Sequence, residues 1–290
     1  MNKPNHILAV ALAIVAALSA LSAPAMAQYD PAGPRLRVLT YNIHHGEGTD
    51  GRFDYQRLAK MINDLRPDIV AVQEVDRGTG RADGVDQAAV LGKLTGMRST
   101  FGNAMHYDGG EYGEAVLSRY PILGVRVHHL PFRYGQEPRA ALAVAVQPEG
   151  MPELLFVGTH LCHQSSATRL EQCQQLDRIL PAGGPLPVIL AGDLNARSGS
   201  DAMAVLLDGR WIDCVAPRSR IDYVLVRKED PWQVTSVNII DDRVTSDHRP
   251  VLVELVWTGE IEQEVAAAEE PAAATPLAPA EASDETDQPR

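Results

Sequence analysis

The chain has 290 residues and carries 38 acidic against 26 basic side chains, so its formal net charge is −12. It contains 3 cysteines, an odd number that permits at most one internal disulfide and excludes a fold built on a disulfide framework. No basic stripe of the kind that neutralises many phosphates is visible in the sequence, although a local basic groove is compatible with an acidic total.

The first 27 residues have the pattern of a secretory signal peptide. Lys3 and His6 precede an apolar run from Ile7 to Leu21, and Ala25-Met26-Ala27 supplies a small-x-small cleavage site. The run is shorter than a membrane span, so we expect no stable membrane anchor. The mature chain is predicted to begin near Gln28 and to work in the periplasm or outside the cell.

The other end, residues 259–290, is rich in Ala, Glu and Pro and poor in large apolar residues, so we predict a disordered acidic tail. The tail has a net charge of −8 and the leader +1; taking both from −12 leaves −5 for residues 28–258. This body is long enough for one large catalytic α/β domain, and we expect a monomer. Cys162 and Cys173 are a candidate disulfide pair, and three free thiols, with Cys214, are the alternative.

Apolar periodicity predicts mixed helices and strands along the body. The first half shows a strand over 36–42, a helix over 58–65 that Pro67 ends, a strand over 69–72, and a helix over 87–94 before an irregular stretch. Strands follow over 114–118, 122–130, 139–146 and 154–160, then a helix over 165–180, a buried strand from 188, helical turns over 202–207, and strands over 221–226, 234–239 and 250–256. Parallel crossovers combined with hairpins indicate mixed sheets covered by helices.

Polar residues gather at the ends of these predicted strands. Those that follow a strand are Asn42, Glu74, His160, Asp193 and Asn195, and those that precede one are Glu114, Arg139, Asp222, Asp247 and His248. If the second group of strands runs antiparallel to the first, all these side chains meet at one edge. The hairpin of 139–146 with 154–160 supports this arrangement, because its turn brings Arg139 and His160 to the same end.

So many carboxylates at one edge require a cation among them, and oxygen ligands favour Mg²⁺ or Mn²⁺ over Zn²⁺. A zinc site at His44-His45 is disfavoured, because adjacent side chains in an extended segment face opposite ways. A hard cation beside histidines and an arginine suits attack of water on a phosphate ester. No Gly-x-Ser-x-Gly or Walker sequence supports a covalent serine or nucleotide-driven mechanism.

Six short motifs stand in the order found in the endonuclease/exonuclease/phosphatase superfamily, which the body resembles from about Leu36 to Trp257. They are Thr40-Tyr41-Asn42, Gln73-Glu74-Val75, Gly158-Thr159-His160-Leu161, Gly192-Asp193-Leu194-Asn195, Arg220-Ile221-Asp222-Tyr223 and Ser246-Asp247-His248-Arg249-Pro250. The resemblance implies a DNase I-like, four-layer α/β sandwich, in which two mixed sheets pack face to face with helices outside.

The resemblance also implies a role for each matching residue. Glu74 would be the main Mg²⁺ ligand, with Asn42 and Asp247 completing or flanking the metal site. Asp222 would hold His248, which acts on the phosphate or its attacking water. Asp193 and Asn195 would position and activate the nucleophile and stabilise the phosphorane-like state, while His160 and Arg139, with Asn195, bind phosphate oxygens. Whether Asp193 or His248 is the base stays open.

The substrate is expected to be a phosphodiester, with a lipid head group, a small phosphoester and nucleic acid all open. A secreted DNA or RNA nuclease is the main alternative, and a non-catalytic binding module is a lesser one. Inositol polyphosphate 5-phosphatase activity is disfavoured, because that group's Trp-Cys-Asp-Arg type of signature is missing around Asp222. One position differs from many relatives, which carry Asn where this chain has Glu114. Glu114 is expected either to face solvent or to enter the site and recruit a second cation or a cationic head group.

Overall fold

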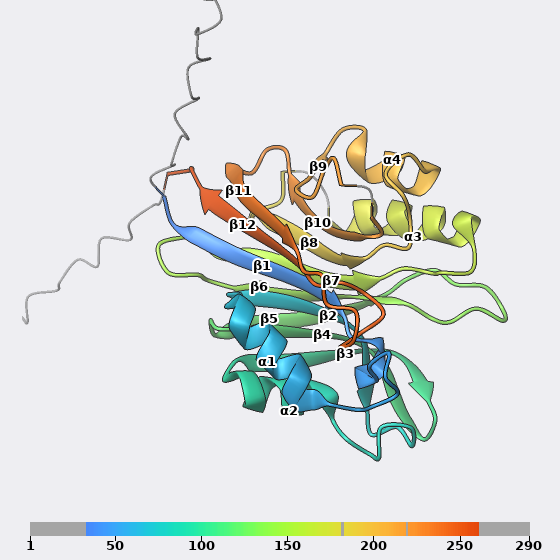
Figure 1. Ribbon diagram of the computed structural model, residues 1–290. Coiled ribbons are helices and arrows are strands. Elements are labelled where there is room, and N and C mark those ends of the chain that lie inside the picture. Colours follow the sequence, from blue (N-terminus) through green and yellow to red (C-terminus); the bar gives the residue numbers. More distant parts are fainter. Residues whose placement is uncertain (1–32, 181–182, 219, 261–290) are drawn as a thin grey trace, which may run out of the picture.

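The computed structural model describes residues 33–180, 183–218 and 220–260. Its core is a sandwich of two six-stranded sheets, with α1 (Tyr55–Leu65) and α2 (Gln87–Thr95) on one outer face and α3 (Ser166–Ile179) and α4 (Asp201–Leu207) on the other (Figure 1). A short 3-10 helix, η1, covers His44–Gly46. The predicted four-layer α/β sandwich is therefore confirmed.

Each sheet combines one parallel pair with antiparallel neighbours. The first sheet has the order β11 (Trp232–Ile239), β12 (Val251–Trp257), β1 (Arg35–Asn42), β2 (Ile69–Arg77), β4 (Gly110–Ser118), β3 (Arg98–Tyr107). The second has the order β5 (Ile122–His129), β6 (Ala140–Val146), β7 (Leu154–His160), β8 (Val188–Asp193), β10 (Asp222–Arg227), β9 (Trp211–Asp213). β1 pairs in parallel with β2, and β7 with β8. Both parallel pairs carry continuous apolar runs, as expected of strands covered on two faces.

Three apolar cores hold the layers together. The core between the sheets includes Ile69, Val144, Phe156, Ile189 and Val253, all fully buried. Separate cores join α1 and α2 to the first sheet and α3 and α4 to the second.

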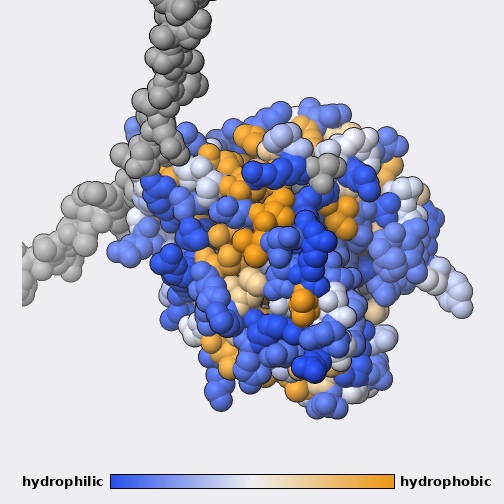
Figure 2. All heavy atoms as spheres, in the orientation of Figure 1, coloured by the Kyte–Doolittle hydropathy of each residue, from blue (hydrophilic) through white to orange (hydrophobic). Residues whose placement is uncertain are grey.

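The edge strand β11 completes the core between the sheets. Its partly buried residues Val234, Val237 and Ile239 pack against that core. In Figure 2 hydrophobic residues gather near the middle of an otherwise largely hydrophilic face, in the area where Figure 1 draws β11 and β12.

Local signals explain where the helices begin and end. Asp54, Asp86, Ser165 and Ser200 each precede a helix and accept a hydrogen bond from a backbone N–H of its first turn. α1 ends at Leu65 because Arg66 adopts a left-handed conformation directly before Pro67.

Two strands were not predicted. The stretch expected to be irregular is β3, which forms a hairpin with β4 through Asp108-Gly109, both at positive φ. Asp-Gly is a strong signal for such a turn, but the polar, half-exposed residues of this edge strand hid it from the apolar pattern. The three-residue strand β9 is too short to show any periodicity.

The predicted pairing of Cys162 with Cys173 is not formed, since all three cysteines are free and buried. No helix in the described part of the chain is both long and apolar enough to span a membrane. The predicted signal peptide, and the predicted tail beyond Glu260, lie outside the described residues.

Candidate functional site

The strand ends named from the sequence converge on one pocket. β1, β2, β7 and β8 end there, while β4, β6, β10 and β12 begin nearby, so residues far apart in the chain meet. The pocket has a volume of about 370 Å³. Its lining includes His44, His45, Glu74, Arg81, Met105, Tyr107, Tyr112, Glu137, Arg139, His160, His163, Asp193, Asn195 and His248.

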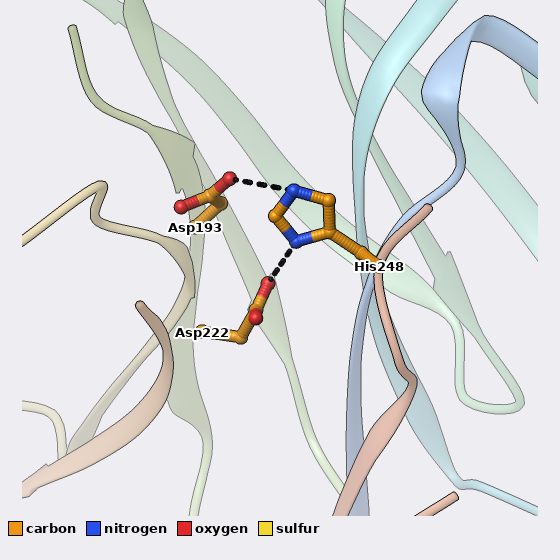
Figure 3. Close-up of side chains that lie close together, drawn as sticks. All are labelled: Asp193, Asp222 and His248. Carbon is orange, nitrogen blue, oxygen red and sulfur yellow. Dashed lines mark hydrogen bonds and ion pairs between the residues drawn. The ribbon is translucent and has the colours of Figure 1, made fainter. Parts of the chain in front are cut away.

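His248 lies between two buried aspartates (Figure 3). Its Nδ1 is 2.9 Å from Asp222 Oδ1, and its Nε2 is 3.5 Å from Asp193 Oδ2. The two aspartates occupy paired positions on neighbouring antiparallel strands, β8 and β10, which fixes their spacing. The predicted partnership of Asp222 with His248 is therefore present in the structure.

The electrostatics of this trio differ from those of free side chains. Burial alone would lower the pKa of His248, but the hydrogen bond and charge of Asp222, with Asp193, raise it to about 9. Burial, and the neighbouring charge of Asp222, raise the pKa of Asp193 to about 7. At neutral pH the imidazole is thus positively charged, whereas Asp193 can exchange a proton.

A backbone irregularity aims Glu74 at the pocket. β2 is bulged between Val72 and Val75 against β4, and Glu74 has a φ of 59°. Positive φ is costly for glutamate, and such strain clusters at functional sites. Asn42 Nδ2 donates to Glu74 Oε1 over 2.9 Å and lies 3.3 Å from Asp193 Oδ2, so it joins the two carboxylates.

Glu74 stays ionised in this setting. Burial would raise the pKa of its carboxyl, but the nearby imidazole of His45, whose Nδ1 is 3.9 Å from Oε2, the hydrogen bond from Asn42 and the charge of Arg139 outweigh burial and lower it. Within the described residues no lysine or arginine forms an ion pair with Glu74, so its ionised carboxylate is suited to bind a cation.

Arg139 and His160 lie together in the pocket lining, as expected from the predicted hairpin. Arg139 Nη1 is 3.0 Å from His160 Nδ1, and both side chains are almost fully buried. Because a guanidinium only donates, Nδ1 accepts, and the proton of a neutral ring sits on Nε2. Burial and the charge of Arg139 lower the pKa of His160 well below 6.5, so this ring is neutral. Its protonated Nε2 is 3.5 Å from Asp193 Oδ2. Asn195 Nδ2 lies 2.9 Å from Nε2 but is itself a donor, so it accepts no hydrogen bond from this tautomer.

The turn after β8 places Asp193 and Asn195. A Cβ on Gly192 would lie 1.9 Å from the carbonyl oxygen of Thr159, so the close approach of β7 and β8 requires glycine there. Asn195 takes a φ of 48°, which asparagine tolerates, and its backbone N–H donates to Asp193 Oδ1.

The donor set fits a hard divalent cation. In the described part of the chain the ion pairs of Glu74 and Asp193 are with histidines alone, so these carboxylates have no fixed strong counter-charge. Asp193, Asp222 and His248 also present ligand atoms within 4.8 Å of one another. Asp247 has an exposed side chain near Ser246 Oγ and is outside the lining described above. Its predicted part in the metal site stays a prediction.

Glu114 takes neither of the two expected positions. It is 1% exposed on β4, opposite the bulge that carries Glu74, and both carboxylate oxygens lack a hydrogen-bond partner within the described residues. Burial raises the pKa of Glu114 well above its ordinary value, despite the nearby charge of Arg139. We conclude that it is a neutral acid packed behind the pocket, not a surface residue.

Several lining residues were not predicted. His44 and His45 are not extended: both have positive φ, and their ring centroids lie 4.3 Å apart beside the pocket. The premise that their side chains face opposite ways is therefore wrong. Arg81, Tyr107 and Tyr112 also line the pocket, although the apolar pattern gave no signal for them.

Comparisons with known proteins agree with this fold. The model of the endonuclease/exonuclease/phosphatase family matches residues 39–248. This range is well over half of the chain, so the protein belongs to that family, whose members act on phosphate esters, including those of nucleic acids.

The individual relatives share about a quarter or less of their residues with this chain. The uncharacterised Escherichia coli protein YbhP is 26% identical over 247 residues, covering 76% of this chain and 95% of that one. An endonuclease/exonuclease/phosphatase from Beutenbergia cavernae superposes with a TM-score of 0.66 at 26% identity, covering 78% of this chain and 72% of that one. The Bacteroides thetaiotaomicron mannosyl-6-phosphatase Bt3783 has a TM-score of 0.61 at 22% identity, over 77% and 100% of the chains, and supports the fold alone.

Proposed function

We propose that this protein is an exported, Mg²⁺- or Mn²⁺-dependent phosphodiesterase in which water attacks the phosphorus. The observation that carries the proposal is the position of His248, bonded to buried Asp222 and facing Asp193, on the wall of a pocket that also holds Glu74 and Arg139. A nuclease is the alternative within the same family.

In the proposed site, Glu74 and Asn42 would hold the metal, with Asp247 flanking it. A bound divalent ion supplies charge that neutralises phosphate oxygens and lowers the pKa of water. Glu74 suits this role because the nearby His45 imidazole and the hydrogen bond from Asn42 keep it ionised.

Two side chains of the protein carry out the proton transfers, Asp193 as the base and His248 as the acid. Asp193, whose pKa is raised to about 7, accepts a proton from the attacking water near neutral pH. His248, held by Asp222, stays charged and donates from Nε2 to a phosphate oxygen or to the leaving group. Asn195 orients the water beside Asp193, and Arg139 with neutral His160 donates to the remaining phosphate oxygens.

The size and charge of the site favour a small phosphodiester over a long nucleic acid. The pocket of about 370 Å³ is within the range for a small ligand, and its rim includes Glu137 besides Arg81. Glu137 Oε2 lies 2.6 Å from Arg139 Nη2, so this acid neutralises part of the basic charge that a polyanion extending past the scissile phosphate would need.

The test is a substrate panel with metal supplied. Bis(p-nitrophenyl) phosphate, glycerophosphodiesters, sphingomyelin, phosphoinositides, RNA, and single- and double-stranded DNA are assayed with the wild type and His248→Ala. We expect hydrolysis of at least one small phosphodiester, and a loss of about a thousandfold or more in the variant. DNA or RNA as the only substrate would establish the nuclease, and no hydrolysis of any phosphate ester would contradict the proposal.

A further inference from the structure

Arg81 lines the pocket but belongs to none of the groups assigned above. It lies in the loop after β2, and its side chain is 28% exposed. The role of this basic side chain in the pocket lining is therefore unassigned.

The side chain is held in one orientation by a buried carboxylate. Arg81 Nε lies 2.6 Å from Asp76 Oδ2, and Nη2 lies 2.9 Å from Asp76 Oδ1, while Asp76 itself is fully buried. Thr79 Oγ1 donates to the same aspartate, and the backbone N–H of Arg81 donates to Asp108. A two-point bond to a buried acid fixes the plane of the guanidinium before any ligand arrives.

Two tyrosines fix the position of this guanidinium relative to the catalytic centre. Its carbon lies 4.6 Å from the ring centroid of Tyr107 and 5.4 Å from that of Tyr112. The Tyr112 ring is also 6.0 Å from the guanidinium carbon of Arg139. Both arginines therefore lie beside the Tyr112 ring. The distance between their guanidinium carbons is at most the sum of the distances from each carbon to the centroid of that ring.

One donor of Arg81 is left over. Asp76 engages Nε and Nη2, and within the described residues no hydrogen bond is made by Nη1. A fixed, partly exposed N–H group in a pocket that binds phosphate is suited to an oxyanion.

We propose that Arg81 is a second anion-binding residue, which recognises an oxyanion on the part of the substrate beyond the scissile phosphate. The inference rests on the proposed function, because Arg139 and the catalytic centre take the first phosphate. The favoured substrate is then a small phosphoester with a second phosphate, sulfate or carboxylate group, and the Tyr107 and Tyr112 rings line the space between the two anions.

Binding of non-hydrolysable pairs of ligands to the Mg²⁺-loaded protein tests the proposal. Each pair consists of an alkylphosphonate and the same molecule with a terminal sulfonate, in chains of about two to six carbons. Sulfonate is chosen because it binds Mg²⁺ weakly. Isothermal titration should show that at one chain length the sulfonate improves affinity by about tenfold.

The variant is Asp76→Asn with Arg81→Gln, because removing Arg81 alone would leave a buried aspartate without its partner. In this variant the advantage of the sulfonate should fall below about twofold. Arg77→Gln is the matched control, since Arg77 also stacks on a ring, Phe101, and pairs with Glu111, but is outside the lining described above. The control should keep the full advantage.

Two results would overturn the proposal: no gain from the sulfonate at any chain length in the wild type, or an equal gain in the double variant and the wild type. The hydrolysis panel keeps the two failures apart. If the sulfonate improves affinity through Arg81 but no phosphate ester is hydrolysed, the catalytic assignment alone is refuted. If an ester is hydrolysed but the sulfonate gives no Arg81-dependent improvement in affinity, the second anion site alone is refuted.

Discussion

At the scale of single residues, the proposed chemistry depends on His248. Its two ring nitrogens face two aspartates, and the raised pKa of about 9 keeps the ring charged at neutral pH. Asp193, with a pKa of about 7, is the better base of the two. The sequence left this choice open, and the difference in environment supports Asp193 as the base.

Replacing Asp222 by Asn tests the pairing with His248. An amide cannot stabilise the charged imidazole as a carboxylate does, so the pKa of His248 should fall. We expect turnover to drop by about tenfold or more, and the alkaline limb of the pH–rate profile to move to lower pH. An alkaline limb at its wild-type position would mean that Asp222 does not hold the ring.

The burial of Glu114 leads to a second prediction, which concerns the pH dependence of stability. Its folded-state pKa is raised, so folding retains a proton that the unfolded chain loses above its ordinary pKa of 4.5. The contribution of Glu114 to stability is thus greatest below that pH and is lost as the pH rises toward the folded value.

Glu114→Gln removes this titration while it keeps the shape of the side chain. The melting temperature of the variant relative to the wild type, measured in EDTA from about pH 5 to 8, should rise with pH. The relative gain is at most about 1.4 kcal/mol per pH unit, or a few degrees. Parallel curves for the two proteins would place an ionised Glu114 in the folded state.

At the scale of elements, one side chain, Glu254, links the three strands β1, β12 and β11 of the first sheet by hydrogen bonds. Glu254 on β12 receives hydrogen bonds from Arg35 and Arg37 on β1 and from Thr235 on β11. Partial burial would raise the pKa of Glu254, but these bonds outweigh it and lower the pKa. Its contribution is present above the unfolded pKa and is lost as the pH falls through the folded value.

Glu254→Gln should therefore lower stability at pH 7. The loss should be about 1 kcal/mol, because the arginines are partly exposed and screened by solvent, and the melting temperature should fall by about 2–4 °C. The difference between variant and wild type should narrow below about pH 4. A constant difference at all pH values would point to packing and not charge.

Elements with a clear run or repeat of apolar residues could be predicted from the sequence, and others could not. The buried strands β1, β2, β7 and β8 show it plainly, whereas β3 is a half-exposed edge strand whose pattern is mixed. The bulge that turns Glu74 into the pocket depends on the pairing of β2 with β4, a long-range contact that no local pattern encodes.

At the scale of the whole molecule, the order of motifs predicted the site because topology brings strand ends to one edge. It did not predict that Glu114 is buried behind the pocket, or that Arg81 is fixed on its wall, because both facts depend on packing between distant segments. Asp76 and Arg81 are five residues apart in the chain, but their pairing requires the particular path of the loop between them.

Metal dependence of phosphodiester hydrolysis tests the central claim most directly. The rate with bis(p-nitrophenyl) phosphate is measured in EDTA and again with Mg²⁺ or Mn²⁺ in excess, for the wild type and for Glu74→Gln. We expect chelation to abolish hydrolysis, either ion to restore it, and the folded variant to lose most of the response. Full activity in EDTA, or restoration by Zn²⁺ alone, would contradict the claim.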